Sequence, residues 1–312
     1  MALSLDNYIA EYLPKRGLPW PAMPKADAPK ARPSGDALNI RAVLWTVYGT
    51  LLAIPTGELQ FEADIDFVTD AAFDKTIQEF KMWNSMSRKP GAPAAYMKEI
   101  YRKAYELVRM TGGGEVRAEL IWEDIVKKLQ AKEYAYDAAI YGTQAELTEK
   151  IAYFYHASIQ GVGCYPGAVE VLRSLGERGV KQGLLADGQC FTAGQLRYAL
   201  KQQEPGFELA SCIPAAHHTL SAKQRVKKPH DDLFRAAVAN LRSKGVEPQE
   251  TLHVGSSLTR DIAPAKKLGL RTCLFAGDKA SLAATRGGLT EPATRPDALI
   301  TELPQLLELL KR

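Results

Sequence analysis

The chain has 312 residues, 46% of them hydrophobic and 24% charged, and its formal net charge is +4. The length suits two domains or one domain with a large insertion, and the composition is ordinary for a globular protein. The charge is mild and forms no long block of one sign, so we expect no nucleic-acid partner. No run of about 20 apolar residues and no secretory signal is visible, so we expect no membrane anchor and a cytoplasmic protein. The cysteines are far apart and should be free thiols: Cys164, Cys190, Cys212 and Cys273.

Residues 1–38 form the first segment. Apolar residues recur at helical spacing over residues 3–13, and Pro14 ends this pattern. The stretch from Pro14 to Gly35 is rich in Pro, Ala and Lys and cannot bury enough apolar surface to fold alone. We interpret residues 1–38 as a short helix and an extended arm that lies across the core, with a partner-binding tail as the alternative.

The first strand is expected over Arg41–Val47, where an apolar run ends in a Tyr-Gly-Thr turn. Such a run is typical of a buried parallel strand. Ligands of open α/β sheets bind outside the carboxyl ends of the strands, so this turn is the first place to look for chemistry.

The following region, residues 57–156, is helical almost throughout. Phe73, Ile77 and Phe80 recur at spacings of three and four, and breaks fall at residues 89–91 and 111–114. Its size is that of a small inserted domain. We expect its aromatic residues to form its core, namely Trp83, Tyr96, Tyr101 and Trp122.

Strand and helix alternate again after residue 156. Further strands are expected within residues 181–188, 207–214, 251–257, 271–277 and 296–300. Helices are expected at residues 168–179, from near Pro229, and at residues 261–269 and 302–312. Short connections between them predict an α/β fold with a doubly wound parallel sheet, covered on both faces.

The order and spacing of these segments resemble the haloacid dehalogenase superfamily. The resemblance implies a Rossmann-like core formed by residues 39–56 and 157–312, with a C1-type α-helical cap domain at residues 57–156. It also implies four catalytic motifs at the carboxyl ends of the strands.

The first two motifs depart from the family pattern. Thr46 stands where the family has its nucleophilic Asp, and Tyr48 stands where phosphatases have a second Asp, as in true dehalogenases. Thr50 keeps its place in the turn. Ala186 replaces the Ser or Thr that holds the anionic group of the substrate, and Asp187 replaces an Asn.

The last two motifs are better preserved. Lys228, with Lys227 as its neighbour, matches the family lysine, and Asp261 matches the second acidic residue of the fourth motif. Ser256 stands where phosphatases hold Mg²⁺ with an Asp, and the Ser256–Ser257 pair is similar to the dehalogenase pattern, which needs no metal. None of the five histidines falls on a catalytic position of the family.

A Thr hydroxyl is a poor nucleophile without a base, so these replacements favour a pseudoenzyme with a binding or regulatory role. A small anionic ligand would have as candidate contacts Lys228, Thr50, Asp187 and Ser257. Two alternatives stay open. One is an active hydrolase with altered catalytic residues, which would use Mg²⁺ with Asp261 as a candidate ligand. The other is a protein that binds a partner through its N-terminal arm. A protein partner and a homodimer are left open, and no cofactor is expected otherwise.

Overall fold

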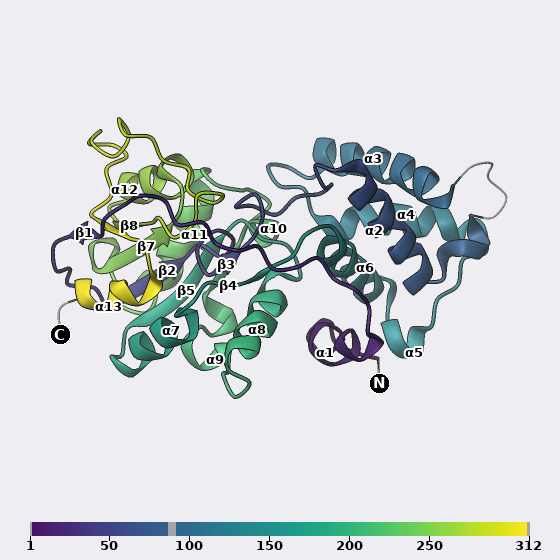
Figure 1. Cartoon of the computed structure of the whole chain (residues 1–312), viewed down its shortest axis with the longest axis horizontal. Helices are drawn as coiled ribbons and strands as arrows, with labels where there is room; N and C mark the ends of the chain where they lie inside the picture. Colours follow the sequence, from purple (N-terminus) through teal and green to yellow (C-terminus); the bar gives the residue numbers. More distant parts are fainter. Residues whose placement is uncertain (1, 87–91, 311–312) are drawn as a thin grey trace. The chain divides into compact units, whose positions relative to one another are not determined.

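The computed structural model describes residues 2–86 and 92–310. The chain forms two compact units, one helical and one built on a sheet (Figure 1). Unit 1 comprises Met1–Ala22, Gln60–Gly161 and Gln189–Gln195, and unit 2 comprises Met23–Leu59, Val162–Gly188 and Leu196–Arg312. The expected insertion therefore forms the main part of unit 1, and two segments from outside the insertion join it.

Unit 2 contains a seven-stranded sheet in the order β1-β9-β8-β7-β2-β5-β6. Its strands are β1 (Ser34–Gly35), β2 (Ala42–Trp45), β5 (Lys181–Ala186), β6 (His218–Leu220), β7 (Thr251–Gly255), β8 (Arg271–Phe275) and β9 (Ala298–Ile300). All neighbours are parallel except β1, which runs antiparallel to β9 at the edge. A separate two-stranded ribbon joins β3 (Leu52–Ala53) and β4 (Gly163–Cys164).

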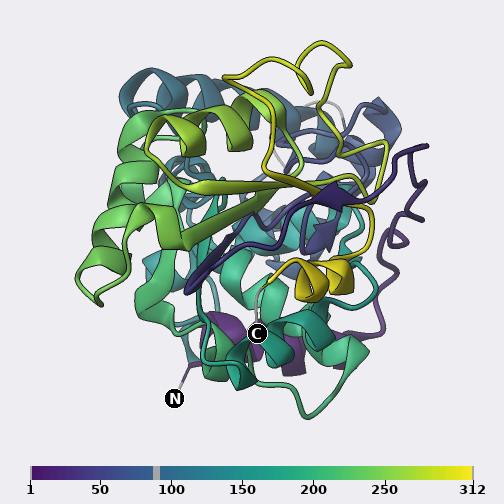
Figure 2. The same cartoon turned by 90° about the vertical axis from the view of Figure 1, so that its left-hand side faces the viewer.

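Helices cover both faces of this sheet. Successive residues of a strand point to opposite faces, so apolar residues throughout a strand need a covering helix on each side. Val43 and Trp45 of β2 belong to one apolar cluster, together with the buried side of α7 (Ala168–Glu177). Leu44 belongs to the opposite cluster, together with the buried side of α11 (Asp231–Arg242). The other helices of unit 2 are α9 (Leu209–Cys212), α10 (Ser221–Gln224), α12 (Ala263–Lys267) and α13 (Leu306–Leu309), and α8 (Thr192–Gln203) begins in unit 1 and ends in unit 2. The doubly wound α/β core predicted from the sequence is confirmed (Figure 2).

Unit 1 is an α-helical unit, as the apolar spacing predicted. Its helices are α1 (Leu5–Asn7), α2 (Asp66–Glu79), α3 (Pro93–Thr111), α4 (Ala118–Gln130), α5 (Ala138–Tyr141) and α6 (Gln144–Ile159). Tyr101 and Trp122 are buried and lie with their ring centroids 5.5 Å apart, as expected of core residues. Trp83 is not a core residue, because it is 53% exposed in a short turn where Met82 and Met86 take the buried positions. Tyr96 is half-buried.

The prediction of a strand at residues 207–214 is wrong. The hydrogen bond from Ile213 N to Leu209 O, 2.7 Å long, closes one turn of helix there, and the third strand of the alternation is β6. The break expected at residues 111–114 is found, since α3 ends at Thr111, whereas residues 89–91 lie outside the described part. All four cysteines are free. Within residues 2–86 and 92–310, no helix is both long and apolar enough to span a bilayer.

Candidate functional site

The site predicted from the motifs lies where three neighbouring parallel strands end. β2 lies between β5 and β7, so the residues that follow these strands come together at one edge of the sheet. Thr46 follows β2, Asp187 follows β5, and Ser256 follows β7. Gly49 lies in the turn after β2 with φ +77, and a Cβ there would lie 2.9 Å from Ser256 Oγ, so the turn and this contact both require glycine.

A buried cluster of Thr46, Lys228 and Asp261 forms the centre of the site. Lys228 Nζ lies 2.6 Å from Asp261 Oδ1 and 2.7 Å from Thr46 Oγ1, and the Thr46 hydroxyl donates to Asp261 Oδ1 over 2.9 Å. The two charged side chains are only 2% and 4% exposed. Three of the residues singled out in the sequence are therefore brought into direct contact. Lys227 is exposed, so Lys228 is the lysine of this cluster.

His253 also belongs to the cluster, although the sequence motifs did not indicate it. Its Nε2 lies 3.5 Å from Thr46 Oγ1 and 3.4 Å from both Lys228 Nζ and Asp261 Oδ1. The register explains the contact: His253 of β7 lies opposite Leu44 of β2, on the side of the sheet to which Thr46 also points. The signal available in the sequence was a histidine in the middle of the short, mostly apolar strand Thr251–Gly255.

Protonation follows from these contacts. Burial and the nearby Lys228 ammonium lower the pKa of His253, so its ring is neutral. His253 Nδ1 lies 3.1 Å from the Leu44 carbonyl oxygen, which only accepts hydrogen bonds, so Nδ1 carries the proton and Nε2 is left as an acceptor. Burial alone would raise the pKa of Asp261, but the Lys228 ammonium outweighs it and holds that pKa well below its usual range. Asp261 is therefore ionised.

A second group of charges lies on the loops around this cluster. Asp187 Oδ1 accepts from the backbone N–H of Lys228 over 2.8 Å, and Asp187 Oδ2 is paired with Arg260. Arg260 also donates to Glu58 over 2.5 Å. Arg260 thus connects the chain segments that follow β3, β5 and β7. Burial lowers the pKa of Arg260, but Asp187 and Glu58 outweigh this effect and raise it.

The other predicted residues have mainly backbone or packing roles. Ser257 Oγ accepts from the N–H of Arg260 over 3.2 Å, and Ser257 N donates to Asp261 Oδ2 over 2.9 Å. Tyr48 is buried and bridges to Leu52. Thr50 is fully buried, and its hydroxyl has no hydrogen-bond partner among the described residues. Ala186 closes β5 and is also fully buried.

The residues at this edge do not fit Mg²⁺, the metal that the family resemblance implies for phosphatases. Mg²⁺ needs an octahedron of oxygen ligands and usually one or two carboxylates. Asp261 is the carboxylate of the central cluster, and its Oδ1 already accepts from Lys228 while its Oδ2 accepts from Ser257 N. An ammonium group 2.6 Å from the only available carboxylate of the cluster repels a divalent cation. Among the described residues, no group of three or more His, Cys, Asp or Glu is placed to hold a metal.

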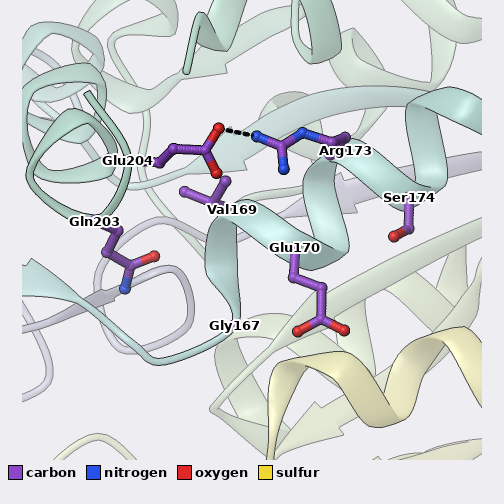
Figure 3. Close-up of a pocket in the computed structure, with 7 residues that line it drawn as sticks. All are labelled: Gly167, Val169, Glu170, Arg173, Ser174, Gln203 and Glu204. Atoms are coloured by element: carbon purple, nitrogen blue, oxygen red, sulfur yellow. Dashed lines mark hydrogen bonds and ion pairs between the residues drawn. The ribbon is translucent and has the colours of Figure 1, made fainter. Parts of the chain in front are cut away.

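A separate cavity of about 320 Å³ lies within unit 2, between the beginning of α7 and the end of α8 (Figure 3). Its charged lining consists of Glu170, Arg173 and Glu204, and Arg173 is paired with Glu204. No residue predicted from the motifs lines this cavity.

Comparison with known proteins supports the assignment made from the motifs. Residues 40–269 match the family model of the haloacid dehalogenase-like hydrolases. The chain is 35% identical over 148 residues to a glyceraldehyde 3-phosphate phosphatase of Pyrococcus furiosus, covering 47% of this chain and 54% of that protein. It is 30% identical over 134 residues to a phosphoglycolate phosphatase of Rhodospirillum rubrum, covering 43% of this chain and 50% of that protein. The chain thus spans about half the length of these curated relatives.

Among solved structures, the fold is similar to that of a 2-haloacid dehalogenase from Pseudomonas syringae pv. Tomato. The TM-score is 0.53 at 20% identity, and the match covers 86% of this chain and 97% of that one. At this identity the likeness concerns the fold alone. The family match extends over most of the chain and includes Thr46, Lys228 and Asp261. This chain belongs to the haloacid dehalogenase-like hydrolase family.

Proposed function

We propose that this protein does not perform the covalent hydrolysis of its family and acts instead as a binding or regulatory protein built on the same fold. One observation carries the proposal: the hydroxyl of Thr46 donates a hydrogen bond to Asp261 and accepts one from Lys228. Thr46 has no carboxylate with which to attack a substrate, and its hydroxyl is held in a closed set of hydrogen bonds.

No group of the cluster is available to activate Thr46. Asp261 accepts a hydrogen bond from Thr46, but its lowered pKa makes it a weak base. His253 Nε2 faces the Lys228 ammonium at 3.4 Å and can accept a hydrogen bond from it. Lys228 then has three acceptors for its three protons, namely Thr46, Asp261 and His253. The network is satisfied internally, so there is no free base and no free cation.

The charges of the site also bear on the kind of ligand. The cluster and its surrounding loops contain two cations, Lys228 and Arg260, and three carboxylates, Asp261, Asp187 and Glu58. Their sum is one negative charge. A neutral ligand therefore fits these loops better than the small anion expected from the motifs.

The test is a turnover assay on purified protein. Substrates are glyceraldehyde 3-phosphate, phosphoglycolate, a generic phosphate ester and a set of 2-haloacids, each with and without Mg²⁺. The control is Thr46→Val, which keeps the shape of the side chain and the Lys228–Asp261 pair but removes the hydroxyl. We expect the natural protein and the control to give the same background rate. Turnover well above that of Thr46→Val would refute the proposal.

A second candidate is an active hydrolase in which Thr46 attacks and His253 acts as the base. The observation in its favour is the 3.5 Å separation between Thr46 Oγ1 and His253 Nε2. The phosphatase names of the relatives make phosphate esters the substrates to try first. This candidate requires turnover that is lost in both Thr46→Val and His253→Gln.

A further inference from the structure

The N-terminal segment, residues 2–38, lies outside the matched family region, yet it contacts the rest of the chain at several points, although much of it is exposed. The family match begins at residue 40. Residues 2–22 belong to unit 1, and the segment from Met23 onward belongs to unit 2. The sequence predicted a short helix and an extended arm across the core for this segment, with a partner-binding tail as the alternative. That alternative requires an accessible arm, and the contacts of the segment favour an internal role instead.

In unit 1 the segment is held by burial, charge and ring contacts. Tyr8 and Ile9 are buried, and the Tyr8 ring lies 6.3 Å from that of Tyr141. Arg16 donates to Glu79 over 3.2 Å, and the Glu79 side chain is only 3% exposed. The Lys75 ammonium lies 3.6 Å from the centre of the Trp20 ring in the same unit.

In unit 2 the segment is held mainly by backbone hydrogen bonds. Lys279 N donates to Asp27 O over 2.8 Å, and the Lys279 ammonium pairs with the Asp27 carboxylate at 2.9 Å. β1 adds an antiparallel strand to the edge of the sheet beside β9 (Figure 2). Leu38 N then donates to Leu309 O over 2.7 Å.

Between these two halves the segment touches the connector Gln160–Cys164, which contains one of the points where the chain passes from unit 1 to unit 2. A Cβ on Gly161 would lie 1.9 Å from the carbonyl oxygen of Ala22, within unit 1. A Cβ on Gly163 would lie 1.8 Å from Met23 Sδ, within unit 2. Neither glycine has a positive φ, so close approach of the segment, and not backbone freedom, explains why both positions need glycine.

We propose that residues 2–38 form an internal strap that braces the connector Gln160–Cys164. The strap is anchored on a different unit at each end, and its crossing at Ala22–Met23 packs directly on Gly161 and Gly163. Backbone held on both sides opens less often than a free linker, so the amides of the connector should exchange slowly with solvent. This role depends on neither of the candidate functions above.

The test compares Gly161→Ala with Gly206→Ala by hydrogen exchange of the full chain. Gly206 is exposed, and a Cβ there has nothing within 4 Å, so it is a matched control. In Gly161→Ala the new methyl group pushes Ala22 away. We expect exchange at least about tenfold faster in two peptides, residues 157–166 and residues 17–27, which corresponds to a loss of roughly 1.4 kcal/mol of local stability. Gly206→Ala should exchange as the natural protein does.

A second variant keeps the proposal testable if Gly161→Ala does not fold. Met23→Ala removes the side chain that lies against Gly163 without adding a clash, and it should also speed exchange in residues 157–166. Trypsin cleavage after the exposed Lys25 should be faster in the same variants. Unchanged exchange of residues 157–166 in a folded Gly161→Ala or Met23→Ala protein would overturn the proposal.

Discussion

Replacing Lys228 by Met tests whether the central ion pair is a structural part of the fold. Met keeps the apolar stem of lysine and removes only the ammonium. The Asp261 carboxylate, 4% exposed, would then be left buried with Thr46 Oγ1 and Ser257 N as its donors. Removing one partner of a buried pair costs about 3–5 kcal/mol, because the remaining charge is uncompensated. We therefore expect a loss of this size in the free energy of unfolding at pH 7.

Urea unfolding followed by circular dichroism measures this loss, with Lys227→Met as the control. Lys227 is the adjacent lysine and is exposed, so its replacement should change stability by less than about 0.5 kcal/mol. The double variant Lys228→Met/Asp261→Leu should regain much of the loss, since it buries no lone charge. A lysine retained for catalysis can be replaced with little loss or with a gain in stability. If Lys228→Met were as stable as Lys227→Met, the reasoning would be refuted.

The remaining predictions concern acid stability and the turn after β2. Burial lowers the pKa of both His253 and His156, the latter to about 3, and an unfolded histidine titrates near 6.5. As pH falls below about 6.5 the unfolded state therefore binds protons first, and each histidine costs roughly 1.4 kcal/mol of stability per pH unit. His156→Phe should lose about 2 kcal/mol less than the natural protein between pH 7 and pH 5 in urea titrations; an equal loss would contradict the assignment. Gly49→Ala would place a Cβ 2.9 Å from Ser256 Oγ on a backbone with φ +77, so we expect it to lower the free energy of unfolding by about 1–3 kcal/mol. Thermal unfolding measures this loss, and a loss no larger than that of Gly206→Ala would show that the turn relaxes.

Most of the core was predictable because its strands are short apolar runs that end at a turn. The runs ending at Trp45, Ala186, Gly255 and Phe275 all formed parallel strands. Residues 207–214 were mistaken for a strand because their apolar side chains, Phe207 among them, are buried at a spacing compatible with either structure. Periodicity alone does not separate one helical turn from a short strand.

The contacts of the site were less predictable than its position. Motif spacing located Thr46, Lys228 and Asp261, but it did not show that Asp261 would both pair with Lys228 and accept a hydrogen bond from Thr46. His253 was missed because its contact depends on the register between β2 and β7, which a single sequence does not state. An N-terminal arm lying across the core was expected, but its individual contacts were not predictable, since a Pro-rich composition is also typical of a free tail.

The most direct test of the central claim is mass spectrometry of the peptide that contains residue 46, during incubation with phosphate esters and 2-haloacids. A family phosphatase with its nucleophilic Asp serves as the positive control for trapping an adduct. We expect the peptide of this protein to keep its unmodified mass with every compound. A covalent adduct on Thr46 that appears with substrate and is absent from Thr46→Val would show that the site is a working nucleophile.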